Sequence, residues 1–448
     1  MQPNAHDKQR LTVVIGLGKT GLACARYLHA AGVPVAVTDS RANPPELEAA
    51  RRELPGVELR LGGFDEALLA AADEVVISPG VSLNEPAFAA ALARGVPFVS
   101  EIELFARAAK SPVIAITGSN GKSTVTTLVG LMAERAGLDV GVGGNLGTPA
   151  LELLRQPEPD LYVLELSSFQ LETTESLRPL AAVVLNISAD HMDRYSSLED
   201  YAAAKERIYR RAEVAVVNAD DPMVMAMALN PNAMVTFSVA GAQSEGFGVV
   251  ERDGVQWIAR NGQTLAAAAE VRIPGRHNLA NALAALALGE AAGLPLHAMA
   301  EVLREFPGLP HRTQWVGAAD GITWYDDSKG TNVGATLAAV QGMSSPVVLI
   351  AGGDGKGQDF SPLRAALRDK ARAVVLIGRD APLIEQSLAG VVPTVRASDM
   401  DDAVRQCRAL AQAGDVVLLS PACASFDMFK GYSHRGDVFR EAVRRWAL

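Results

Sequence analysis

Residues 113–124 read VIAITGSNGKST, and this stretch decides the fold. An apolar, strand-like run ends at Thr117, a glycine-containing loop follows, and the helix-like segment VTTLVGLMAERAG begins directly after it. A strand, a loop ending in Gly-Lys-Ser-Thr and a helix are typical of a triphosphate-binding unit. Ile116 stands where the usual pattern has a further glycine, so this loop is a shortened variant.

This loop predicts a nucleoside triphosphate site with a bound metal ion. Lys122 supplies a positive charge for the β- and γ-phosphates, and a hydroxyl of Ser123 or Thr124 can bind Mg²⁺. Backbone N–H groups can point at phosphate oxygens. The residues that offer them are Gly118, Ser119, Asn120, Gly121 and Lys122.

The same alternation of strand and helix occurs before and after this unit. Val- and Ile-rich runs alternate with Ala-, Leu- and Arg-rich segments in the first hundred residues, and again from SPVVLIAGG (345–353) onward. This rhythm predicts parallel sheets with crossover helices. We expect an α/β protein with three domains, at 1–101, 102–308 and 309–448. Residues 231–273 are turn-rich, which predicts a small antiparallel insert or extension of the middle domain.

Composition excludes several classes of protein. The chain has 448 residues, of which 49% are hydrophobic and 21% charged, and its net charge of −10 argues against a nucleic-acid partner. No apolar run of about 18 residues predicts a spanning helix, and the N-terminus lacks the apolar run of a signal peptide. Three widely spaced cysteines show no metal or disulfide pattern. We therefore expect a cytoplasmic protein without a membrane partner.

A second glycine loop, GLGKTG (16–21), follows the strand-like run TVVI. Its glycines allow a tight turn and the close approach of a phosphate to a helix N-terminus. Asp39 ends the next strand, near the spacing at which an acid binds a ribose hydroxyl. An NAD(P)-dependent dehydrogenase fits this loop, but so does any protein that holds a nucleotide diphosphate. A dehydrogenase leaves the Gly-Lys-Ser-Thr loop without a role.

Two candidate metal ligands follow later strands. Glu165 ends the strand-like run LYVLE, where its carboxylate would face the phosphate loop, although a helix-capping acid is an alternative. His191 follows the run AAVVLNIS, at the carboxyl end of a strand, where open sheets bind ligands. A structural histidine is the alternative there.

Several motifs together resemble the Mur ligases over essentially the whole chain. They are TGSNGKST (117–124), GGNLG (143–147), ELSSFQLE (165–172), NISADHMDRY (186–195), GRHNLANALAAL (275–286), LPHR (309–312), DDSKGTN (326–332), AGGDGKG (351–357) and SPACASFDMFKGYSHRGDVF (420–439). The HMDRY, DDSKGTN and SPACASFD blocks are similar to those of the members that add D-glutamate. The lysine loop is shared with folylpolyglutamate synthases, which lack a nucleotide-binding domain ahead of it.

The resemblance implies a fold and a reaction. The fold would be a Rossmann-like N-terminal domain, a central P-loop ATPase-like parallel sheet and a Rossmann-like C-terminal domain. The reaction would be ATP-dependent addition of D-glutamate to UDP-N-acetylmuramoyl-L-alanine through an acyl phosphate, in the synthesis of peptidoglycan precursors for cell wall, shape and division. A monomer is implied. A sibling ligase that adds another amino acid and a non-catalytic ATP sensor are alternatives.

The resemblance also implies site residues. ATP would contact the lysine loop together with Asn278, Asn281, Arg312 and Asp327. One Mg²⁺ would bind Ser123, Thr124 and Glu165, and a second would bind His191 and a carbamylated Lys205, with Lys122, His191 and Lys205 as catalytic residues. The UDP substrate would contact Gly18, Lys19, Thr20, Asp39, Ser40, Arg41, Ser78, Gly80 and Asn145.

The amino acid would bind in the C-terminal domain. Its phosphate and carboxylate partners would be Lys329, Thr331, Lys356, Ser425 and Tyr432. Two positions depart from the family pattern, because Tyr432 stands where phenylalanine is usual and Gly330 replaces a commoner alanine. From sequence alone, Lys205 resembles one charge on a solvated helix face.

Overall fold

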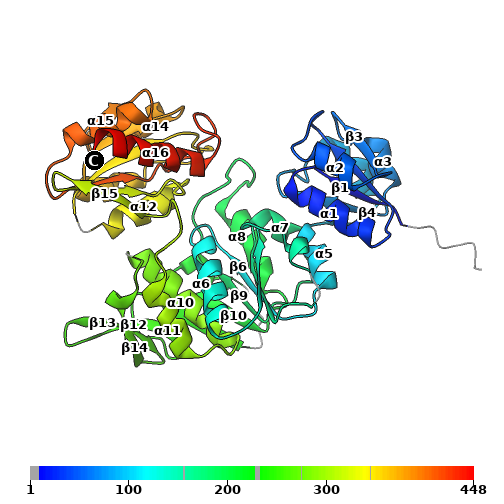
Figure 1. Ribbon diagram of the computed structural model, residues 1–448, viewed down its shortest axis with the longest axis horizontal. Helices are drawn as coiled ribbons and strands as arrows, with labels where there is room; N and C mark the ends of the chain where they lie inside the picture. The colour runs from blue at the N-terminus through cyan, green and yellow to red at the C-terminus, as the bar shows by residue number, and fades with distance from the viewer. Residues whose placement is uncertain (1–9, 155–156, 228–232, 274, 344) are drawn as a thin grey trace, which may run out of the picture.

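The computed structural model describes residues 10–154, 157–227, 233–273, 275–343 and 345–448, which form three α/β domains (Figure 1). Each domain contains its own β-sheet, so the predicted fold class is confirmed. Within the described ranges, no helix is both long and apolar enough to cross a membrane. The predicted limits at residues 101 and 308 stay predictions.

The N-terminal sheet is parallel, with the order β3-β2-β1-β4-β5. The order reverses between β1 and β4, so the loops that follow these two strands flank the crevice where open α/β sheets bind ligands. The elements are β1 (Thr12–Ile15), α1 (Lys19–Ala30), β2 (Val35–Asp39), α2 (Leu47–Glu53), β3 (Glu58–Leu61), α3 (Glu66–Ala71), β4 (Glu74–Ile77), α4 (Ala89–Ala93) and β5 (Phe98–Val99).

The central sheet has nine strands in the order β14-β13-β12-β11-β10-β9-β6-β8-β7. The strands from β7 to β12 are parallel, and β13 and β14 add an antiparallel edge. Residues 233–267 therefore extend the sheet of the middle domain as expected, but the expected antiparallel pairing holds only from β12 to β14, since β11 pairs in parallel with both of its neighbours. The strands are β6 (Val113–Thr117), β7 (Val140–Gly144), β8 (Leu161–Glu165), β9 (Ala181–Val184), β10 (Val214–Asn218), β11 (Ala233–Ser238), β12 (Gly246–Arg252), β13 (Val255–Arg260) and β14 (Gln263–Ala267).

Helices cover both faces of this sheet. One face packs against α6, α10 and α11 through an aliphatic core. The opposite face shares a second core with α1 and α5, so apolar packing is continuous between the N-terminal and central domains. The helices are α5 (Glu101–Ala108), α6 (Lys122–Arg135), α7 (Ser168–Glu172), α8 (Leu198–Glu206), α9 (Pro222–Met225), α10 (Arg276–Ala291) and α11 (Leu296–Glu305).

The C-terminal sheet has the order β15-β16-β20-β17-β18-β19 and is parallel except for β15. The loops after β16, β17 and β20 therefore share one edge. The elements are β15 (Gln314–Ala319), β16 (Ile322–Asp326), α12 (Val333–Gly342), β17 (Val347–Gly352), α13 (Leu363–Lys370), β18 (Ala371–Ile377), α14 (Ala381–Leu388), β19 (Thr394–Arg396), α15 (Met400–Leu410), β20 (Val416–Leu419) and α16 (Tyr432–Trp446).

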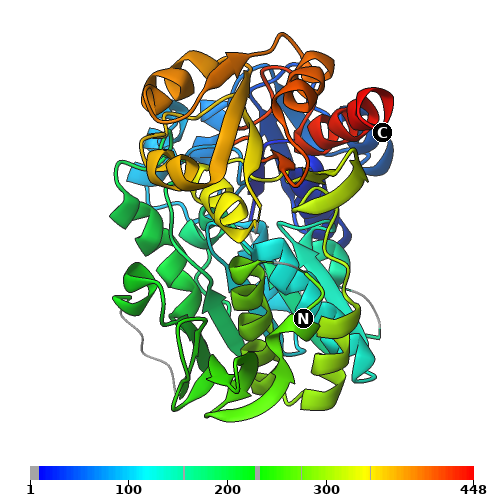
Figure 2. The same cartoon turned by 90° about the vertical axis from the view of Figure 1, so that its left-hand side faces the viewer.

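The N-terminal and C-terminal domains both rest on the central domain (Figures 1 and 2). In Figure 2 the C-terminal domain lies above the central one, and α12 is turned toward it. Helix α12 packs beside α10 of the central domain. This arrangement brings loops from all three domains to one region.

Candidate active site

The N-terminal glycine loop connects β1 to α1. Gly16 has a φ of +88°, and a Cβ at this position would lie 2.9 Å from Ser78 Oγ. A Cβ on Gly21 would lie 1.8 Å from the Gly16 carbonyl oxygen, so packing requires both glycines. Among the described residues, no heavy atom lies within 4 Å of a Cβ placed on Gly18. Gly18 thus leaves open space at the N-terminus of α1, where a diphosphate would fit.

Asp39 is engaged by its own neighbours. Its Oδ2 accepts a hydrogen bond from the Leu17 N–H at 2.7 Å, and its Oδ1 accepts one from the Arg41 N–H at 2.8 Å. The Arg41 guanidinium also pairs with this carboxylate, at 2.7 Å. Burial alone would raise the pKa of Asp39, but the bonds from Arg41 and Leu17 hold that pKa below its ordinary value. The carboxylate orders the glycine loop. A ribose hydroxyl that bonds to Asp39 would have to use oxygens that already accept hydrogen bonds from Leu17 and Arg41.

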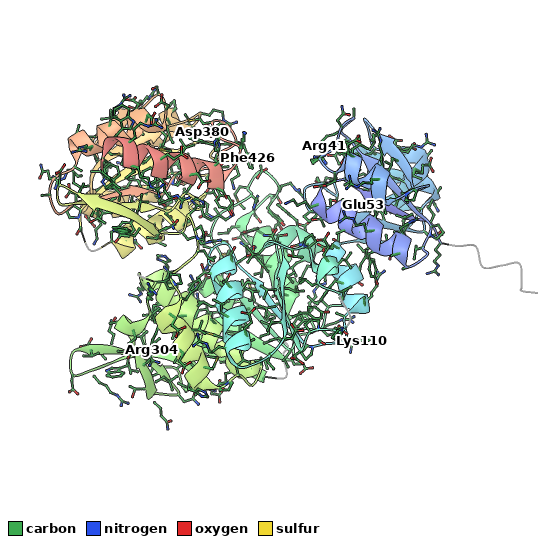
Figure 3. All side chains as sticks on the ribbon, in the orientation of Figure 1. Arg41, Glu53, Lys110, Arg304, Asp380 and Phe426 are labelled. Atoms are coloured by element: carbon green, nitrogen blue, oxygen red, sulfur yellow. The ribbon has the colours of Figure 1, made fainter. Side chains whose placement is uncertain are left out.

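The other residues expected to bind the uridine nucleotide lie at the same edge of the sheet. Lys19 and Thr20 begin α1, Ser40 follows β2, and Ser78 and Gly80 follow β4. The Arg41 side chain is half-exposed on the N-terminal domain, and Figure 3 shows it on the part of that domain nearest the C-terminal one in that view. The structure therefore groups these residues around the predicted crevice.

The phosphate loop of the central domain encloses the ammonium group of Lys122. The Nζ atom donates hydrogen bonds to the carbonyl oxygens of Gly118 at 2.8 Å and Ser119 at 3.0 Å. Burial lowers the pKa of Lys122. Gly121 precedes α6 with a φ of +84°, and a Cβ there would lie 2.3 Å from Asn281 Oδ1. The loop can therefore be formed only with glycine at this position.

Glu165 presents an anionic oxygen without a partner. Its Oε1 accepts a hydrogen bond from Asn145 Nδ2 at 2.7 Å, whereas Oε2 is buried and has no hydrogen-bond partner among the described residues. Burial alone would raise its pKa, but the charge of Lys122 and the bond from Asn145 hold the pKa below its ordinary value. A buried, ionised oxygen with no donor is the environment that a cation stabilises.

His191 and Lys205 line a cavity that Glu165 also lines. The His191 ring packs edge-on against Phe169, with ring centroids 5.0 Å apart, and burial lowers its pKa. A neutral imidazole is the form that binds metals.

Lys205 is 1% exposed, so the solvated helix face suggested by the sequence is wrong. Its Nζ lies 3.5 Å from Thr117 Oγ1 and 4.5 Å from the centre of the Tyr201 ring. Burial, and then the charge of Lys122, lower the pKa of Lys205 well below its ordinary value. Burial therefore disfavours the charged form of this amine.

The donor set fits a magnesium ion that also binds phosphate. In the described part of the chain, no group of three or more His, Cys, Asp or Glu side chains could hold a metal alone. Magnesium usually takes one or two carboxylates and completes its shell with water and phosphate oxygens. The free Oε2 of Glu165 and the buried hydroxyls of Ser123 and Thr124 match that requirement.

This cavity has a volume of about 330 Å³ and is lined by residues of all three domains. The C-terminal domain reaches the phosphate loop directly, because Arg312 Nη2 donates a hydrogen bond to Ser123 Oγ at 2.7 Å. The lining residues come from the N-terminal loop (Pro79, Gly80), the central domain (Ser119, Asn120, Gly121, Lys122, Ser123, Asn145, Glu165, Ser167, Ser168, Phe169, Asp190, His191, Tyr201, Lys205) and the C-terminal domain (Arg312, Lys329, Thr331, Asn332, Lys356).

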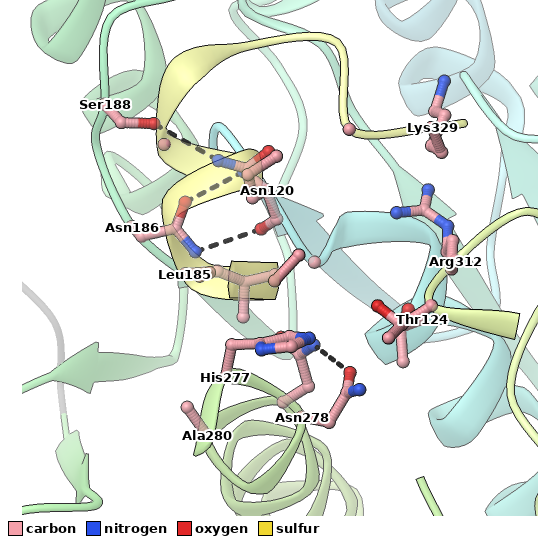
Figure 4. A pocket seen from close by; sticks show the side chains of 18 of the residues that line it. Asn120, Thr124, Leu185, Asn186, Ser188, His277, Asn278, Ala280, Arg312 and Lys329 are labelled. Carbon is pink, nitrogen blue, oxygen red and sulfur yellow. Dashed lines mark hydrogen bonds between the residues drawn. The ribbon is translucent and has the colours of Figure 1, made fainter. Parts of the chain in front are cut away.

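A second cavity of about 290 Å³ adjoins the phosphate loop (Figure 4). It brings together Asn278, Asn281, Arg312 and Asp327, the four residues expected near adenine and ribose. Burial raises the pKa of Asp327 to about 7, although its carboxylate accepts a hydrogen bond from Ser420 at 2.7 Å. The sequence analysis did not select His277, Asn186, Asn218 and Phe237, which also line this space.

The expected amino-acid residues are only partly assembled. Lys329 Nζ lies 4.0 Å from the centre of the Tyr432 ring, and burial lowers the pKa of Lys329 to about 8. Ser425 is buried, and neither Ser425 nor Tyr432 belongs to the described lining of the two cavities. A Cβ on Gly330 would lie 2.7 Å from Asp327 Oδ2 and from Ser420 Oγ, which explains why glycine suits this chain there.

Asp190 and Asn332 join the domains in the larger cavity, although the sequence left Asp190 open between a turn residue and a site residue and gave Asn332 no role. Asp190 precedes His191 and forms an ion pair with Lys356 at 2.7 Å. Asn332 caps α12 and bonds to Asn120. Their positions in the NISADHMDRY and DDSKGTN motifs were the available signal, but partners 142 and 212 residues away are invisible in one sequence.

Family models match almost every part of the chain. Residues 10–100 match the Mur ligase MurD-like N-terminal domain, residues 116–289 the Mur ligase middle domain, and residues 311–423 the Mur ligase glutamate ligase domain.

Individual relatives cover nearly the full length. The chain is 56% identical over 435 residues to the UDP-N-acetylmuramoylalanine–D-glutamate ligase of Nitrosococcus oceani, covering 97% of this chain and 96% of that one. It is 52% identical to the enzyme of that name from Pseudomonas aeruginosa, covering 97% and 98%. Among solved structures, the UDP-N-acetylmuramate–alanine ligase of Thermotoga maritima aligns with a TM-score of 0.60 at 22% identity, over 97% of this chain and 99% of that one, which supports the fold.

Proposed function

The chain belongs to the Mur ligase family, and from this premise we propose that it joins D-glutamate to UDP-N-acetylmuramoyl-L-alanine with cleavage of ATP, in the synthesis of peptidoglycan precursors. The observation that carries the proposal is the cavity where the Lys122 loop and the free oxygen of Glu165 meet side chains of the C-terminal domain. A dehydrogenase and a folate ligase are excluded, because the N-terminal model and the full-length relatives both belong to the Mur ligases.

The reaction has two balanced steps. A carboxylate oxygen of the alanyl substrate attacks the γ-phosphorus of ATP, the bond to the β–γ bridging oxygen breaks, and ADP leaves. The amine of D-glutamate then attacks the acyl carbon, its carbon–nitrogen bond forms, and inorganic phosphate departs as the amine loses a proton. The difficulty is the meeting of several anions, so cations and position supply most of the catalysis.

The chain's own cations would screen this charge. The Lys122 ammonium lies within the phosphate loop, and Lys329, Lys356 and Arg312 face the same cavity from the C-terminal domain. Their positions support contacts of the lysine loop and Arg312 with ATP, and of Lys329 and Lys356 with the phosphoryl and carboxylate groups. Enclosure of the cavity by three domains would keep water from the acyl phosphate.

Magnesium would bind on the central domain. Ser123, Thr124 and Glu165 would hold one ion, and His191 with a carbamylated Lys205 would hold a second. Bound Mg²⁺ neutralises phosphate charge and orients the terminal phosphoryl group. Burial disfavours the charged form of the Lys205 amine, and this supports carbamylation, because an uncharged amine attacks CO₂ and the product is an anion.

The two substrates would enter from opposite domains. Gly18, Lys19 and Thr20 begin or precede α1 and would hold the diphosphate, and Ser78 and Gly80 would complete the uridine pocket. The uridine side would be lined by Asp39, Ser40 and Arg41. Thr331, Ser425 and Tyr432 would complete the D-glutamate site with Lys329 and Lys356. We further propose a cytoplasmic monomer that acts, through cell-wall precursors, in cell shape and division. The cytoplasmic location is supported by the three cysteines, which are free and buried.

The decisive experiment measures phosphate release from ATP with UDP-N-acetylmuramoyl-L-alanine and each candidate amino acid in turn. We expect release with D-glutamate and background rates with L-glutamate, L-alanine, L-lysine and meso-diaminopimelate. Equal release with another amino acid would establish a sibling ligase. No release with any of them, in the presence of Mg²⁺, would remove the proposal.

A further inference from the structure

Arg435 is the feature of the C-terminal domain that the proposed reaction does not yet use. It lies in the first turns of α16 and is 0% exposed. Burial lowers its pKa to about 10, so the guanidinium remains charged at neutral pH. Within the described residues its printed hydrogen bonds go to hydroxyl and carbonyl oxygens and none goes to a carboxylate, whereas buried charges in proteins are normally paired. A charge buried in this way is retained for a specific set of hydrogen bonds.

The guanidinium bonds to two loops. Nε donates to Ser328 Oγ at 3.0 Å, and Nη2 donates to the Ser328 carbonyl oxygen at 2.8 Å. Nη1 donates to the carbonyl oxygens of Cys423 at 3.1 Å and Ala424 at 3.3 Å. The planar group therefore joins the loop after β16 to the loop after β20, which are almost 100 residues apart in the sequence.

Two of the three bonded residues adjoin a residue of the proposed amino-acid site. Ser328 precedes Lys329, and Ala424 precedes Ser425. Ser328 Oγ also donates a hydrogen bond to the Tyr432 carbonyl oxygen at 2.8 Å, and the Tyr432 ring covers the Lys329 ammonium.

The Lys356 loop is tied to the same place. Ala424 exchanges two backbone hydrogen bonds with Asp354, at 2.8 and 3.0 Å. Asp354 stands two residues before Lys356. One guanidinium thus fixes, directly or through one further residue, the loops that carry Lys329, Lys356, Ser425 and Tyr432.

We propose that Arg435 is a positioning residue that assembles the D-glutamate site from these loops without touching the substrate. The inference rests on the proposed function and deepens it. Lysine cannot replace arginine here, because four acceptors in two loops need the planar fork of a guanidinium. Without the guanidinium, the loops that carry the amino-acid site shift, while the phosphate loop of the central domain stays intact.

The test compares Arg435→Lys and Ser328→Ala with Arg440→Lys as the matched control. Arg440 lies on the same helix, is partly exposed and pairs with Asp437 at the surface. We expect Arg435→Lys to raise the KM for D-glutamate by about tenfold or more, and Ser328→Ala to raise it by a smaller factor. The KM for UDP-N-acetylmuramoyl-L-alanine should stay within about twofold of wild type in all three variants, because that substrate would bind in the N-terminal and central domains. The KM for ATP should rise by a smaller factor than that for D-glutamate, because Asp327, which adjoins Ser328, is one proposed ATP contact among several that lie on the central domain.

Chemical rescue separates positioning from general loss of structure. Addition of millimolar guanidinium to Arg435→Ala should lower the KM for D-glutamate, whereas equimolar ammonium should not. The inference is overturned if Arg435→Lys keeps the wild-type KM for D-glutamate, or if all three KM values rise together. If Arg435→Lys fails to fold, an unchanged KM for D-glutamate in Ser328→Ala also overturns the inference. Wild-type protein that does not use D-glutamate overturns the proposed function instead, which keeps the two failures apart.

Discussion

Lys356 and Asp190 form an ion pair that joins the C-terminal domain to the central domain, with Lys356 Nζ 2.7 Å from Asp190 Oδ1. Both side chains are largely buried, at 17% and 11% exposure. Asn332 strengthens the junction, because its amide donates hydrogen bonds to Asn120 at 3.2 Å and to Asp190 at 3.4 Å. A lysine of the proposed amino-acid site is thus held against the residue that precedes a proposed metal ligand.

This pair predicts that Asp190→Asn opens the molecule. Removal of one partner of a buried pair costs about 3–5 kcal/mol, because the remaining charge is left without compensation. We expect a larger radius of gyration by small-angle scattering of the ligand-free protein, and a kcat at least about tenfold lower than wild type. Arg396→Gln, which breaks an exposed pair with Glu385 in the C-terminal domain, is the control and should change neither quantity. Identical scattering and kcat in Asp190→Asn would contradict the role of the pair in closure.

The enclosed ammonium of Lys122 predicts a selective loss of turnover. Lys122→Ala removes the cation from the phosphate loop, so phosphate release should fall by about 100-fold or more while the thermal unfolding midpoint stays near that of wild type. Lys110→Ala removes an exposed lysine just before the central sheet and should leave the rate unchanged (Figure 3). Undiminished phosphate release in folded Lys122→Ala would refute the assignment of this loop.

The sequence predicted the sheets because local pattern determines them. Runs such as residues 113–117 and 347–352 are almost entirely apolar, and both form strands buried along their whole length. The glycine loops were also readable, since Gly16 and Gly121 adopt left-handed φ angles that few other residues allow. Each of these signals lies within about ten residues of chain.

Features that depend on distant partners were not readable. Lys205 is buried because β6 supplies Thr117, which is 88 residues away, against one face of α8. Arg435 resembles one of many charges in YSHRGDVFREAVRR, and its two partner loops decide its burial. Asp39 was expected at a ribose, but the structure shows that Leu17 and Arg41 already occupy its oxygens. For Lys205 and Arg435 the deciding contacts come from the fold rather than from the neighbouring sequence, whereas Arg41, which pairs with Asp39, is a near neighbour in the chain.

The buried position of Lys205 on the lining of the larger cavity predicts a carbamate that can be replaced chemically. Lys205→Ala should lose most activity and regain part of it with acetate or propionate, which supply an anion in the space left by the side chain. Lys122→Ala is the matched control, because a missing cation cannot be replaced by a carboxylate. Carbon-13 NMR of wild type with labelled bicarbonate should show a carbamate signal that is absent from Lys205→Ala. Full activity of Lys205→Ala without an additive would exclude a metal-binding role.

The buried carboxyl group of Glu101, at the junction of the N-terminal and central domains, is expected to make the free energy of unfolding depend on pH. This residue begins α5 and is 1% exposed. Its Oε1 accepts a hydrogen bond from the Leu151 N–H at 3.0 Å, and its Oε2 has no partner among the described residues. Burial raises its pKa from 4.5 to about 7, although the N–H groups of Leu151 and Ala150 oppose the shift. The nearby Glu152 charge, which pairs with Arg26, acts in the same direction as burial.

The sign of the effect follows from this raised pKa. The folded state holds the proton more tightly than the unfolded state, so the stabilisation is complete below pH 4.5 and is lost as the pH rises through 7. A shift of this size corresponds to about 3 kcal/mol. Glu101→Gln cannot lose a proton, so its free energy of unfolding relative to wild type should rise by about 2–3 kcal/mol between pH 5 and pH 8.

Urea unfolding of both proteins at several pH values measures this difference, and Glu103→Gln supplies the control on the same helix. The Glu103 carboxylate accepts hydrogen bonds from the N–H groups of Glu175 and Ser176. Burial alone would raise the pKa of Glu103, but these bonds and those from Ser176 Oγ and Arg107 hold it below its ordinary value. Its contribution is present above pH 4.5, so Glu103→Gln should be less stable than wild type by a nearly constant amount from pH 5 to pH 8. If the free energy of unfolding of Glu101→Gln runs parallel to that of wild type over this pH range, Glu101 is ionised in the folded protein and the junction carries no buried, protonated acid at this residue.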